Sequence, residues 1–271
     1  MINDIKMFKN LLDSMDKTEF GVKASEINIG DIPEQTAPNQ IRDEIPTMNK
    51  FGYMKEEFDE FSFEFIKFAK NKDDIFLELG TAYGWIVRNA LKEGIKIIAS
   101  DIESEHLLIL LQETKKEYLE NLYLNQGRFP DEINLPNESI GAVLTSRMFH
   151  FLDERDVDLG FRKIHNWLKP EGKLFFTSLS PYNYTLRDDF LQIFKARAEE
   201  GVKWCGIVDN MTQQAPEHAE YLNDFLHAFD VPQLEKLLPS YGFKIDKIKL
   251  FDYGNNDSNG IGHVGFVATK I

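Results

Sequence analysis

The sequence IFLELGTAYG, residues 75–84, carries the strongest signal for the fold. Apolar residues flank Glu78 on both sides, a pattern typical of a strand buried on both faces in a parallel sheet. Gly80 ends this predicted strand, and Gly84 precedes the helical pattern WIVRNALKEG. A strand, a glycine-bearing turn and a helix in this order place backbone N–H groups and a helix N-terminus where a ligand can bind. We therefore expect a ligand-binding turn here, although such glycines also occur for packing alone.

The composition is that of an acidic globular protein. The 271 residues, 42% of them hydrophobic and 28% charged, are enough for one large domain with its own core. Because the net charge is −14 and Lys and Arg do not cluster, we expect no nucleic-acid partner. The single cysteine, Cys205, excludes an internal disulfide and a multi-cysteine metal site. With no signal-peptide pattern and no apolar run of membrane-spanning length, we expect no membrane association and a cytoplasmic location.

Strand and helix patterns alternate along most of the chain after residue 75. Besides the first strand, further strands are predicted over residues 95–101, 121–125, 140–145, 173–178, 243–250 and 262–268. Helices are predicted between them over residues 103–120, 155–168 and 231–238. This alternation predicts an α/β fold with a doubly wound, seven-stranded, mostly parallel sheet.

Two segments lie outside this alternation. Residues 1–53 combine a predicted short helix with an extended, proline-containing loop, and residues 181–229 form an insert after the fifth strand, with predicted helices at 186–200 and 218–227. Ligands bind at the carboxyl ends of parallel strands, and the insert leaves the sheet at the end of the fifth strand. We therefore expect both segments to form a lid over the ligand, with the part from the insert largely helical. The domain that carries this lid spans residues 54–271. The alternative for the insert is a dimerisation or packing element.

Asp101 ends the second predicted strand and suggests a ribose-containing ligand. An acid at this place can accept hydrogen bonds from both ribose hydroxyls, as in dinucleotide-binding sites. The dinucleotide fingerprint, however, needs a third small residue where this chain has Trp85. A strand-end acid can also simply cap the helix that follows. Position alone thus favours a ribose without identifying the ligand.

The motifs in this order resemble those of the class I S-adenosylmethionine (SAM) dependent methyltransferases. Residues 78–84, acidic–x–Gly–x–x–x–Gly, resemble the first motif of that family, with Ala82 in place of a frequent middle glycine. Further segments resemble the later family motifs: ASDIESEHL at 99–107, LPNESIGAVLTSRMFHFL at 135–152, WLKPEGKLFFTS at 167–178, LEKLLPSYGFKI at 234–245 and HVGFVATKI at 263–271. The resemblance covers roughly residues 50–180 and 228–271 and implies a Rossmann-like methyltransferase fold that binds SAM and releases S-adenosylhomocysteine.

The resemblance also implies which residues bind SAM. These lie at the carboxyl ends of the strands: Glu78, Gly80, Thr81, Ala82, Gly84, Asp101, Ile102, Arg128, Phe129, Thr145 and Ser146. Ile102 would line the adenine, and Arg128–Phe129 stand where the family often has an Asp and a small residue. Since a guanidinium only donates hydrogen bonds, Arg128 cannot accept one from the adenine amino group. Phe129 or Asp131 would then supply the adenine contact.

The implied chemistry is methyl transfer to a small-molecule acceptor without a metal. The loop Thr145-Ser146-Arg147 lacks both the Asn/Asp-Pro-Pro-aromatic motif of certain N-methyltransferases and the magnesium-binding acid of catechol-type enzymes. The scattered histidines form no zinc-ligand pattern.

In-line methyl transfer depends mainly on positioning, and a base is needed only when the nucleophile must lose a proton. His150 and His218 are the candidates for such a base, the alternative for His150 being packing between two phenylalanines. A SAM-binding sensor or interaction protein without transferase activity is the second functional hypothesis, because it would keep Gly80, Gly84 and Asp101.

Overall fold

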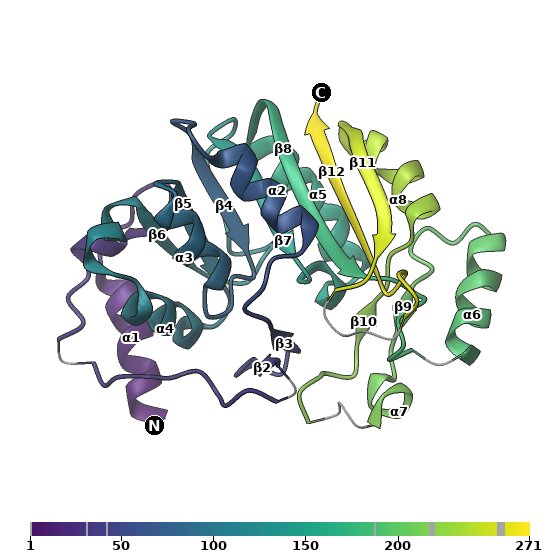
Figure 1. Ribbon diagram of the computed structural model, residues 1–271, viewed down its shortest axis with the longest axis horizontal. Coiled ribbons are helices and arrows are strands. Elements are labelled where there is room, and N and C mark those ends of the chain that lie inside the picture. Colours follow the sequence, from purple (N-terminus) through teal and green to yellow (C-terminus); the bar gives the residue numbers. More distant parts are fainter. Residues whose placement is uncertain (1, 31, 42, 187, 217–219, 254–257) are drawn as a thin grey trace.

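A computed structural model describes the whole chain except Met1, Asp31, Arg42, Arg187 and residues 217–219 and 254–257 (Figure 1). Its main sheet contains eight strands: β1 (Val22–Lys23), β4 (Ile75–Leu79), β5 (Lys96–Asp101), β6 (Leu122–Gln126), β7 (Ile140–Ser146), β8 (Leu168–Leu179), β11 (Phe243–Phe251) and β12 (His263–Lys270). Their order across the sheet is β1-β6-β5-β4-β7-β8-β12-β11.

The five central strands run parallel, and the outer ones run antiparallel to their neighbours. β6, β5, β4, β7 and β8 form the parallel part. β12 pairs antiparallel with β8 and β11, and the two-residue strand β1 adds antiparallel to β6 at the opposite edge. The predicted doubly wound, mostly parallel sheet is confirmed, with β1 as an eighth strand. Two residues are too short to show a strand periodicity, so the sequence pattern did not reveal β1.

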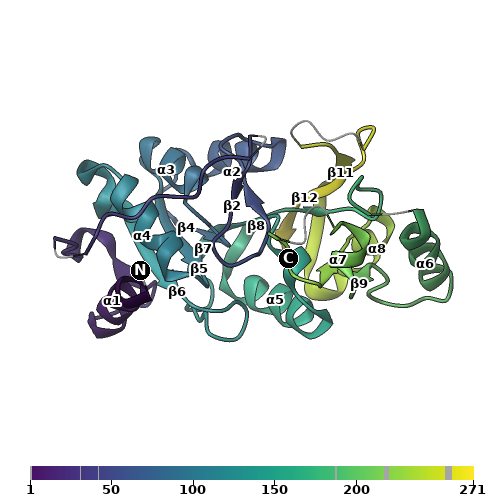
Figure 2. The same ribbon diagram turned by 90° about the horizontal axis from the view of Figure 1, so that it is seen from below.

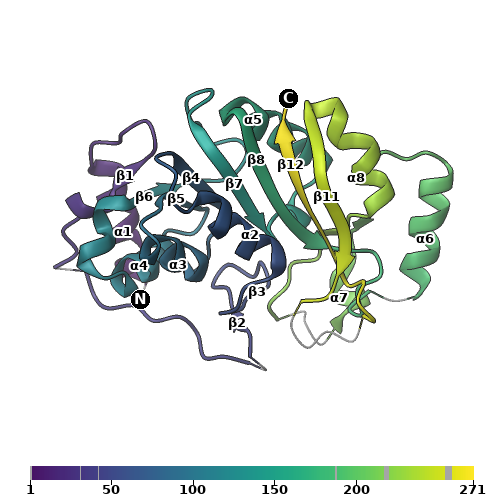
Figure 3. The same cartoon turned by 45° about the horizontal axis from the view of Figure 1, so that its top comes forward.

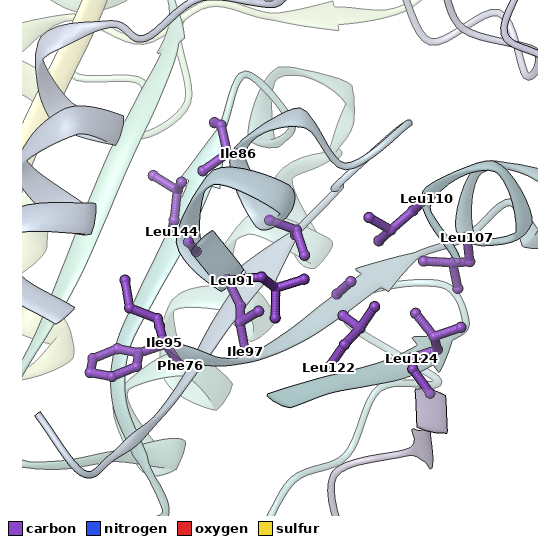
Figure 4. Close-up of a cluster of buried hydrophobic side chains, with 14 of the residues drawn as sticks. Phe76, Ile86, Leu91, Ile95, Ile97, Leu107, Leu110, Leu122, Leu124 and Leu144 are labelled. Atoms are coloured by element: carbon purple, nitrogen blue, oxygen red, sulfur yellow. The ribbon is translucent and has the colours of Figure 1, made fainter. Parts of the chain in front are cut away.

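Helices cover both faces of the sheet, as Figure 2 shows for α2 and α3 on one side and α5 on the other. The first face carries α2 (Glu60–Ala69), α3 (Trp85–Lys92) and α4 (Ser104–Glu113), and the second carries α5 (Glu154–Trp167) and α8 (Val231–Leu237). In Figure 4 the leucines and isoleucines of α3 and α4 point toward the side chains of β5 and β6. The continuous apolar runs of the parallel strands therefore arise from burial on both faces.

Two phenylalanines of α2 belong to this core. Asp59 begins the helix by accepting hydrogen bonds from the amides of Phe61 and Ser62, at 2.8 and 2.9 Å. Phe61 and Phe65 are fully buried over the sheet, whereas Phe63 is half exposed. Phe61 and Phe65 thus pack the helix onto the sheet.

Part of the N-terminal segment also belongs to the core. The helix α1 (Ile2–Ser14) packs against α4, and its Phe8 and Leu12 are buried in the same cluster as Val22 of β1. Beyond a 3₁₀ turn (Ala24–Glu26), the chain runs to the short strands β2 (Ile45–Pro46) and β3 (Tyr53–Met54). Figures 1 and 3 place this pair below the carboxyl ends of β4 and β7. Only this second half of residues 1–53 lies where a lid was expected.

The insert after β8 forms a small unit beside β11. It contains α6 (Asp188–Glu199), β9 (Ile207–Val208), α7 (Met211–Gln214) and β10 (Leu226–His227). The helix expected at 186–200 is present. The helix expected at 218–227 is wrong at its C-terminal end, because residues 226–227 form β10, which pairs antiparallel with β9. Backbone pairing prevails there over the local helical pattern. Residues 217–219 lie outside the described part of the chain.

Candidate active site

A cavity lies between the carboxyl ends of the parallel strands and the β2–β3 pair. Nine of the residues expected at the cofactor line it: Glu78, Gly80, Thr81, Ala82, Asp101, Ile102, Arg128, Phe129 and Ser146. The β2–β3 strap, which we define as residues 45–55, and the loop after β7 also contribute to its wall: Thr47, Asn49, Phe51, Tyr53, Met54, Lys55, Arg147, Met148, Phe151 and Leu152. The remaining lining residues are Trp85, Ile86, Ser100, His106 and Gly127. The fold therefore brings together residues that are far apart in the sequence.

The turn after β4 is held by the neighbouring strand. The amides of Gly80 and Thr81 both donate to the carbonyl of Ser100 on β5, at 2.9 and 3.1 Å. Gly80 has a φ of 73°, and a Cβ there would lie 2.6 Å from the Met148 side chain. Glycine is required at this position because the backbone is left-handed and the β7 loop packs directly against it.

Gly84 serves the turn differently, because it does not line the cavity. Its φ is also 73°, and a Cβ there would lie 2.3 Å from Leu110 of α4. Its amide donates to the carbonyl of Thr81 at 2.9 Å, which closes the turn before α3 begins. The second glycine of the motif thus allows α3 and α4 to approach each other.

Asp101 is the most heavily bonded acid of the site. Its Oδ2 accepts the Ala82 amide at 2.8 Å, and its Oδ1 accepts the Glu103 amide at 2.9 Å and lies 3.1 Å from His106 Nδ1. The carboxylate is 6% exposed and still lines the cavity, beside the half-exposed Ile102. A carboxylate has about four lone-pair sites, so one remains for a ligand hydroxyl.

His106 links this acid to the β2–β3 strap. The amide of Met48 donates to His106 Nε2 at 3.2 Å, which requires that nitrogen to be unprotonated and places the proton on Nδ1, toward Asp101. Burial opposes charging of the ring, but the Asp101 carboxylate, with Glu103 and Glu105, outweighs it and raises the pKa of His106. The only sequence signal was its place on the first turns of the helix after Asp101, and sequence reasoning missed this residue.

Glu78 lies at the base of the cavity. It is 3% exposed, and its Oε2 accepts the Thr81 hydroxyl at 2.9 Å. Burial, with the nearby charge of Asp101, raises the pKa of Glu78 to about 8. The carboxyl is consequently protonated over much of the neutral range when the cavity holds no compensating cation.

Arg128 and Phe129 line the side of the cavity next to β6. Arg128 Nη2 donates to the buried carboxylate of Asp156 on α5 at 2.6 Å, so the guanidinium is held by the protein. Phe129 is 8% exposed and contacts the rings of Phe149 and Trp167. Asp131 is paired with Arg155 at 2.6 Å and does not line the cavity, which leaves Phe129 as the apolar surface there.

Of the two residues at the end of β7 that were expected to contact the cofactor, only one lines the cavity. Thr145 is fully buried in the sheet and does not line the cavity, whereas Ser146 does. Arg147 follows with a φ of 55°, and its amide donates to the carbonyl of Thr177 on β8 at 2.9 Å. This backbone conformation orients the chain so that Arg147, which sequence reasoning did not assign to the site, also lines the cavity.

The two histidines considered as bases are not part of the described cavity wall. His150 lies on the loop after β7, with its Nδ1 3.5 Å from the Ser178 hydroxyl and its ring against Phe151. Burial, helped by the charges of His263 and Arg147, lowers the pKa of His150 to about 3. His218 lies outside the described residues. Their catalytic role stays a prediction.

The insert reaches the site through the strap. The amide of Gly52 donates to the carbonyl of Tyr221 at 3.0 Å, and the rings of Tyr53 and Tyr221 lie 5.5 Å apart. Phe51 forms an isolated bridge with Leu222. No residue of the insert lines the cavity in the part of the chain that the structure describes. The insert therefore supports the strap and does not form the cavity wall.

Comparison with known proteins relates the part of the chain around the cavity to methyltransferases. Residues 76–172 match the family model described as a methyltransferase domain. Over these residues the chain carries a methyltransferase domain, and the match is consistent with a class I SAM-dependent methyltransferase. The matched residues run from β4 to the turn within β8 and include every residue that we place around the cofactor, so SAM is the cofactor of this domain.

One curated relative of the methyltransferase domain is a malonyl-[acyl-carrier protein] O-methyltransferase of Halalkalibacterium halodurans. It is 23% identical over 144 residues, which cover 52% of this chain and 49% of the relative. The chain thus spans about half the length of the curated relative that it matches.

Solved structures share the fold of the methyltransferase domain. SAM-dependent methyltransferases from Mesorhizobium loti and, as a putative member, Listeria monocytogenes superpose with TM-scores of 0.55 and 0.56, each at 16% identity over 78% of this chain and 98% of the other. A glycopeptide N-methyltransferase solved with SAM superposes with a TM-score of 0.51, at 16% identity over 78% of this chain and 87% of the other. At such identities the likeness concerns the fold.

Two further properties of the methyltransferase domain concern metals and membranes. Among the described side chains, no three His, Cys, Asp or Glu residues are grouped as ligands of one metal ion. Within the same described ranges, no helix has both the length and the apolar character needed to cross a membrane.

Proposed function

We propose that this protein transfers the methyl group of SAM to a small-molecule acceptor. The observation that carries the proposal is the position of Asp101, which borders the cavity between the turn after β4 and the apolar side chains of Ile102 and Phe129. A ribose hydroxyl can donate to the remaining lone pair of Asp101 while the attached adenine lies between the two apolar residues. Glu78 and Gly80 then border the amino-acid end of the cofactor.

Bound SAM supplies a methyl group on a sulfonium, which is transferred as the sulfur keeps the electron pair of the broken bond and S-adenosylhomocysteine is released. The contribution of the chain is to position the acceptor in line with that bond. Burial raises the pKa of Tyr53, on the strap, to about 12, so its hydroxyl is suited to donating a hydrogen bond to an acceptor and not to removing a proton. If a base is used, His150 and His218 remain the proposed candidates.

The lid that selects the acceptor is, in this proposal, the strap together with its support from residues 181–229. Strap residues Thr47, Phe51 and Tyr53 line the cavity, and Tyr221 and Leu222 of the insert hold the strap from outside. Such a cover excludes water from the transfer and leaves aromatic and polar groups to orient the acceptor. We propose no nucleic-acid acceptor, because the net charge of −14 opposes contact with phosphates.

The test of the cofactor assignment is the affinity for SAM after the change Asp101→Ala, measured by calorimetry. Loss of one charge-assisted hydrogen bond, worth about 1.5–3 kcal/mol, lowers the affinity at least tenfold. Asp73→Ala, at an exposed acid before β4, is the control and leaves the affinity unchanged. Equal affinity of the wild type and Asp101→Ala would contradict the ribose assignment.

The alternative is a SAM-binding sensor or interaction protein. Such a protein would show the same SAM affinities as a methyltransferase for the wild type and both variants, but it would not transfer the methyl group. Incubation with SAM and a mixture of small metabolites separates the two hypotheses, because only a methyltransferase releases S-adenosylhomocysteine in proportion to the enzyme. SAM binding without any release would favour the sensor.

A further inference from the structure

Two cationic side chains line the cavity on the side away from Asp101. Lys55 of the strap and Arg147 of the loop after β7 both face it, and both lie over the ring of Tyr253, at 5.5 and 4.0 Å from the ring centre. Lys55 is only 9% exposed. We call Lys55, Arg147 and Tyr253 the cationic corner.

The described acids balance the charge of this corner only in part. The carboxylate of Glu44 lies 3.7 Å from the Lys55 ammonium and balances one positive charge. Arg147 forms no ion pair with any described carboxylate, and its Nε is buried without a hydrogen-bond partner. A buried donor without a partner is costly, so it marks a place where a ligand oxygen is expected. Glu78 lines the same cavity and interacts with the charge of Arg147, but burial raises the pKa of Glu78 to about 8 and keeps it protonated near neutral pH. The corner therefore carries a net charge of about one, which a monoanion neutralises.

The histidines beside the corner, His150 and His263, add no positive charge to it at neutral pH. Burial lowers the pKa of His263 to about 4, and Arg147 and Lys55 contribute to the shift in that order. His150, with its pKa lowered to about 3, is likewise neutral at physiological pH. The uncompensated charge in the corner thus resides on Arg147.

The corner faces the acceptor side of the cavity. Asp101 ends β5 and Arg147 follows β7, and β4 with its glycine turn lies between these two strands. A cofactor whose ribose lies at Asp101 therefore extends across the turn toward Met148, and the corner lies beyond it. An arginine fork holds a carboxylate with two hydrogen bonds, and a neighbouring ammonium adds attraction.

We infer that Arg147 and Lys55 form a subsite for a carboxylate group of the methyl acceptor. The inference rests on the proposed function and adds the chemical class of the acceptor, a small molecule with one carboxylate that serves for recognition. The same chemistry is present in the amino-acid end of SAM, whose carboxylate is the competing occupant of the corner.

The test measures the binding of paired probes to the protein saturated with S-adenosylhomocysteine. Hydroxybenzoic, hydroxycinnamic and aliphatic hydroxy acids are each compared with their primary amides by calorimetry. We expect at least one acid to bind tenfold or more tightly than its amide, because only the acid neutralises Arg147. Equal binding of every acid and its amide, or no binding of either, overturns the inference.

Variants of Arg147 test whether the cationic corner causes the tighter binding of acids than of amides. Arg147→Gln removes the preference for acids, and Arg147→Lys, which keeps the charge, retains part of it. Arg162→Gln is the matched control, since Arg162 lies 5.4 Å over the ring of Tyr241 outside the cavity, and it keeps the full preference. A preference for acids that survives in Arg147→Gln overturns the inference.

Cofactor analogues separate the two sources of the carboxylate. 5′-Methylthioadenosine lacks the amino-acid end of S-adenosylhomocysteine. If Arg147→Gln weakens binding of S-adenosylhomocysteine but not of 5′-methylthioadenosine, Arg147 binds the cofactor, and the inference is overturned. Unchanged affinity for both supports it and shows that the variant is folded. Acids that bind with the expected preference but yield no S-adenosylhomocysteine from SAM would contradict the proposed function and leave the subsite in place.

Discussion

Glu78 illustrates how a single residue of the site is set by its surroundings. It is enclosed between β5 and β7 at the end of β4, with one hydrogen bond from Thr81. Because burial is the largest cause of its raised pKa, the folded protein holds a proton that the unfolded chain releases. A cationic group of a bound cofactor would reverse this, since an opposite charge favours the carboxylate.

The raised pKa of Glu78 predicts a pH dependence of stability. Between pH about 4.5 and 8 the folded state binds more protons than the unfolded state, so the free energy of unfolding of the ligand-free protein falls as pH rises, by up to about 1.4 kcal/mol per pH unit. Glu78→Gln removes this slope, which urea unfolding at several pH values measures. Glu117→Gln, at an exposed acid, keeps it. Identical slopes in the wild type and Glu78→Gln would contradict the assignment.

Asp101 shows how one residue combines structural and ligand contacts. Three of its hydrogen bonds hold the turn at Ala82, the start of α4 at Glu103 and the His106 ring. The expected pair of ribose hydrogen bonds is thereby reduced to one unless a protein donor moves away. Asp101 can therefore cap the start of α4 and bind a ribose hydroxyl at the same time.

At the scale of elements, the site depends on how α3, α4 and the strap meet. Met48 on the strap is bonded to His106 of α4, and the Tyr83 hydroxyl donates to the carbonyl of Pro46 at 2.7 Å. The first link joins the strap to α4, and the second joins it to the glycine turn before α3. Since Met48 donates to His106 Nε2, protonation of that nitrogen breaks the first link.

The close approach of α3 to α4 predicts unequal effects of two glycine substitutions. Gly84→Ala and Gly94→Ala both place alanine at a φ near 75°, which costs about 1–2 kcal/mol. Only the Gly84 methyl meets Leu110, at 2.3 Å, whereas nothing lies within 4 Å at Gly94. We expect Gly84→Ala to cost about 1–3 kcal/mol more than Gly94→Ala in urea unfolding. Equal losses would show that the helices move apart without cost.

At the scale of the whole molecule, the N-terminal segment has two roles. Residues 2–26 add a strand to the edge of the sheet and side chains to its core. The strap instead covers the cavity at the carboxyl ends of the parallel strands. Between β1 and β2 the chain runs past α4, where the Gln112 side chain bonds to the backbone of Pro33 and Gln35 (Figure 1). A deletion of the whole segment would combine loss of stability with loss of the cavity wall.

Removal of residues 1–26 is predicted to destabilise the fold. Phe8, Leu12 and Val22 are buried almost completely, and each contributes about 1.5–3 kcal/mol. We expect a lower midpoint of urea unfolding, and in the full chain a larger loss for Phe8→Ala than for Met7→Ala, which changes a 43% exposed side chain of the same helix. An unchanged midpoint after the deletion would place these residues outside the cooperative unit.

The central α/β alternation and most of the candidate cofactor residues followed from the sequence. Buried parallel strands are continuous apolar runs, and a glycine turn and a strand-end acid stand at fixed places beside them, so local pattern is sufficient for Gly80 and Asp101. The pattern failed where an element is held by distant partners. β1 exists because β6 offers an edge, and β10 because β9 lies beside it.

The sequence by itself determined the central parallel strands, the glycine turn and the acid at the end of β5, because the pattern of each lies in residues that are neighbours along the chain. Only the tertiary structure decided that Gly84 packs a helix, that His106 joins the strap to Asp101, and that Lys55 and Arg147 share one cavity. The physical reason is that burial, charge balance and hydrogen-bond satisfaction depend on the separation of groups in space, and residues 55 and 147 become neighbours only when the chain has folded.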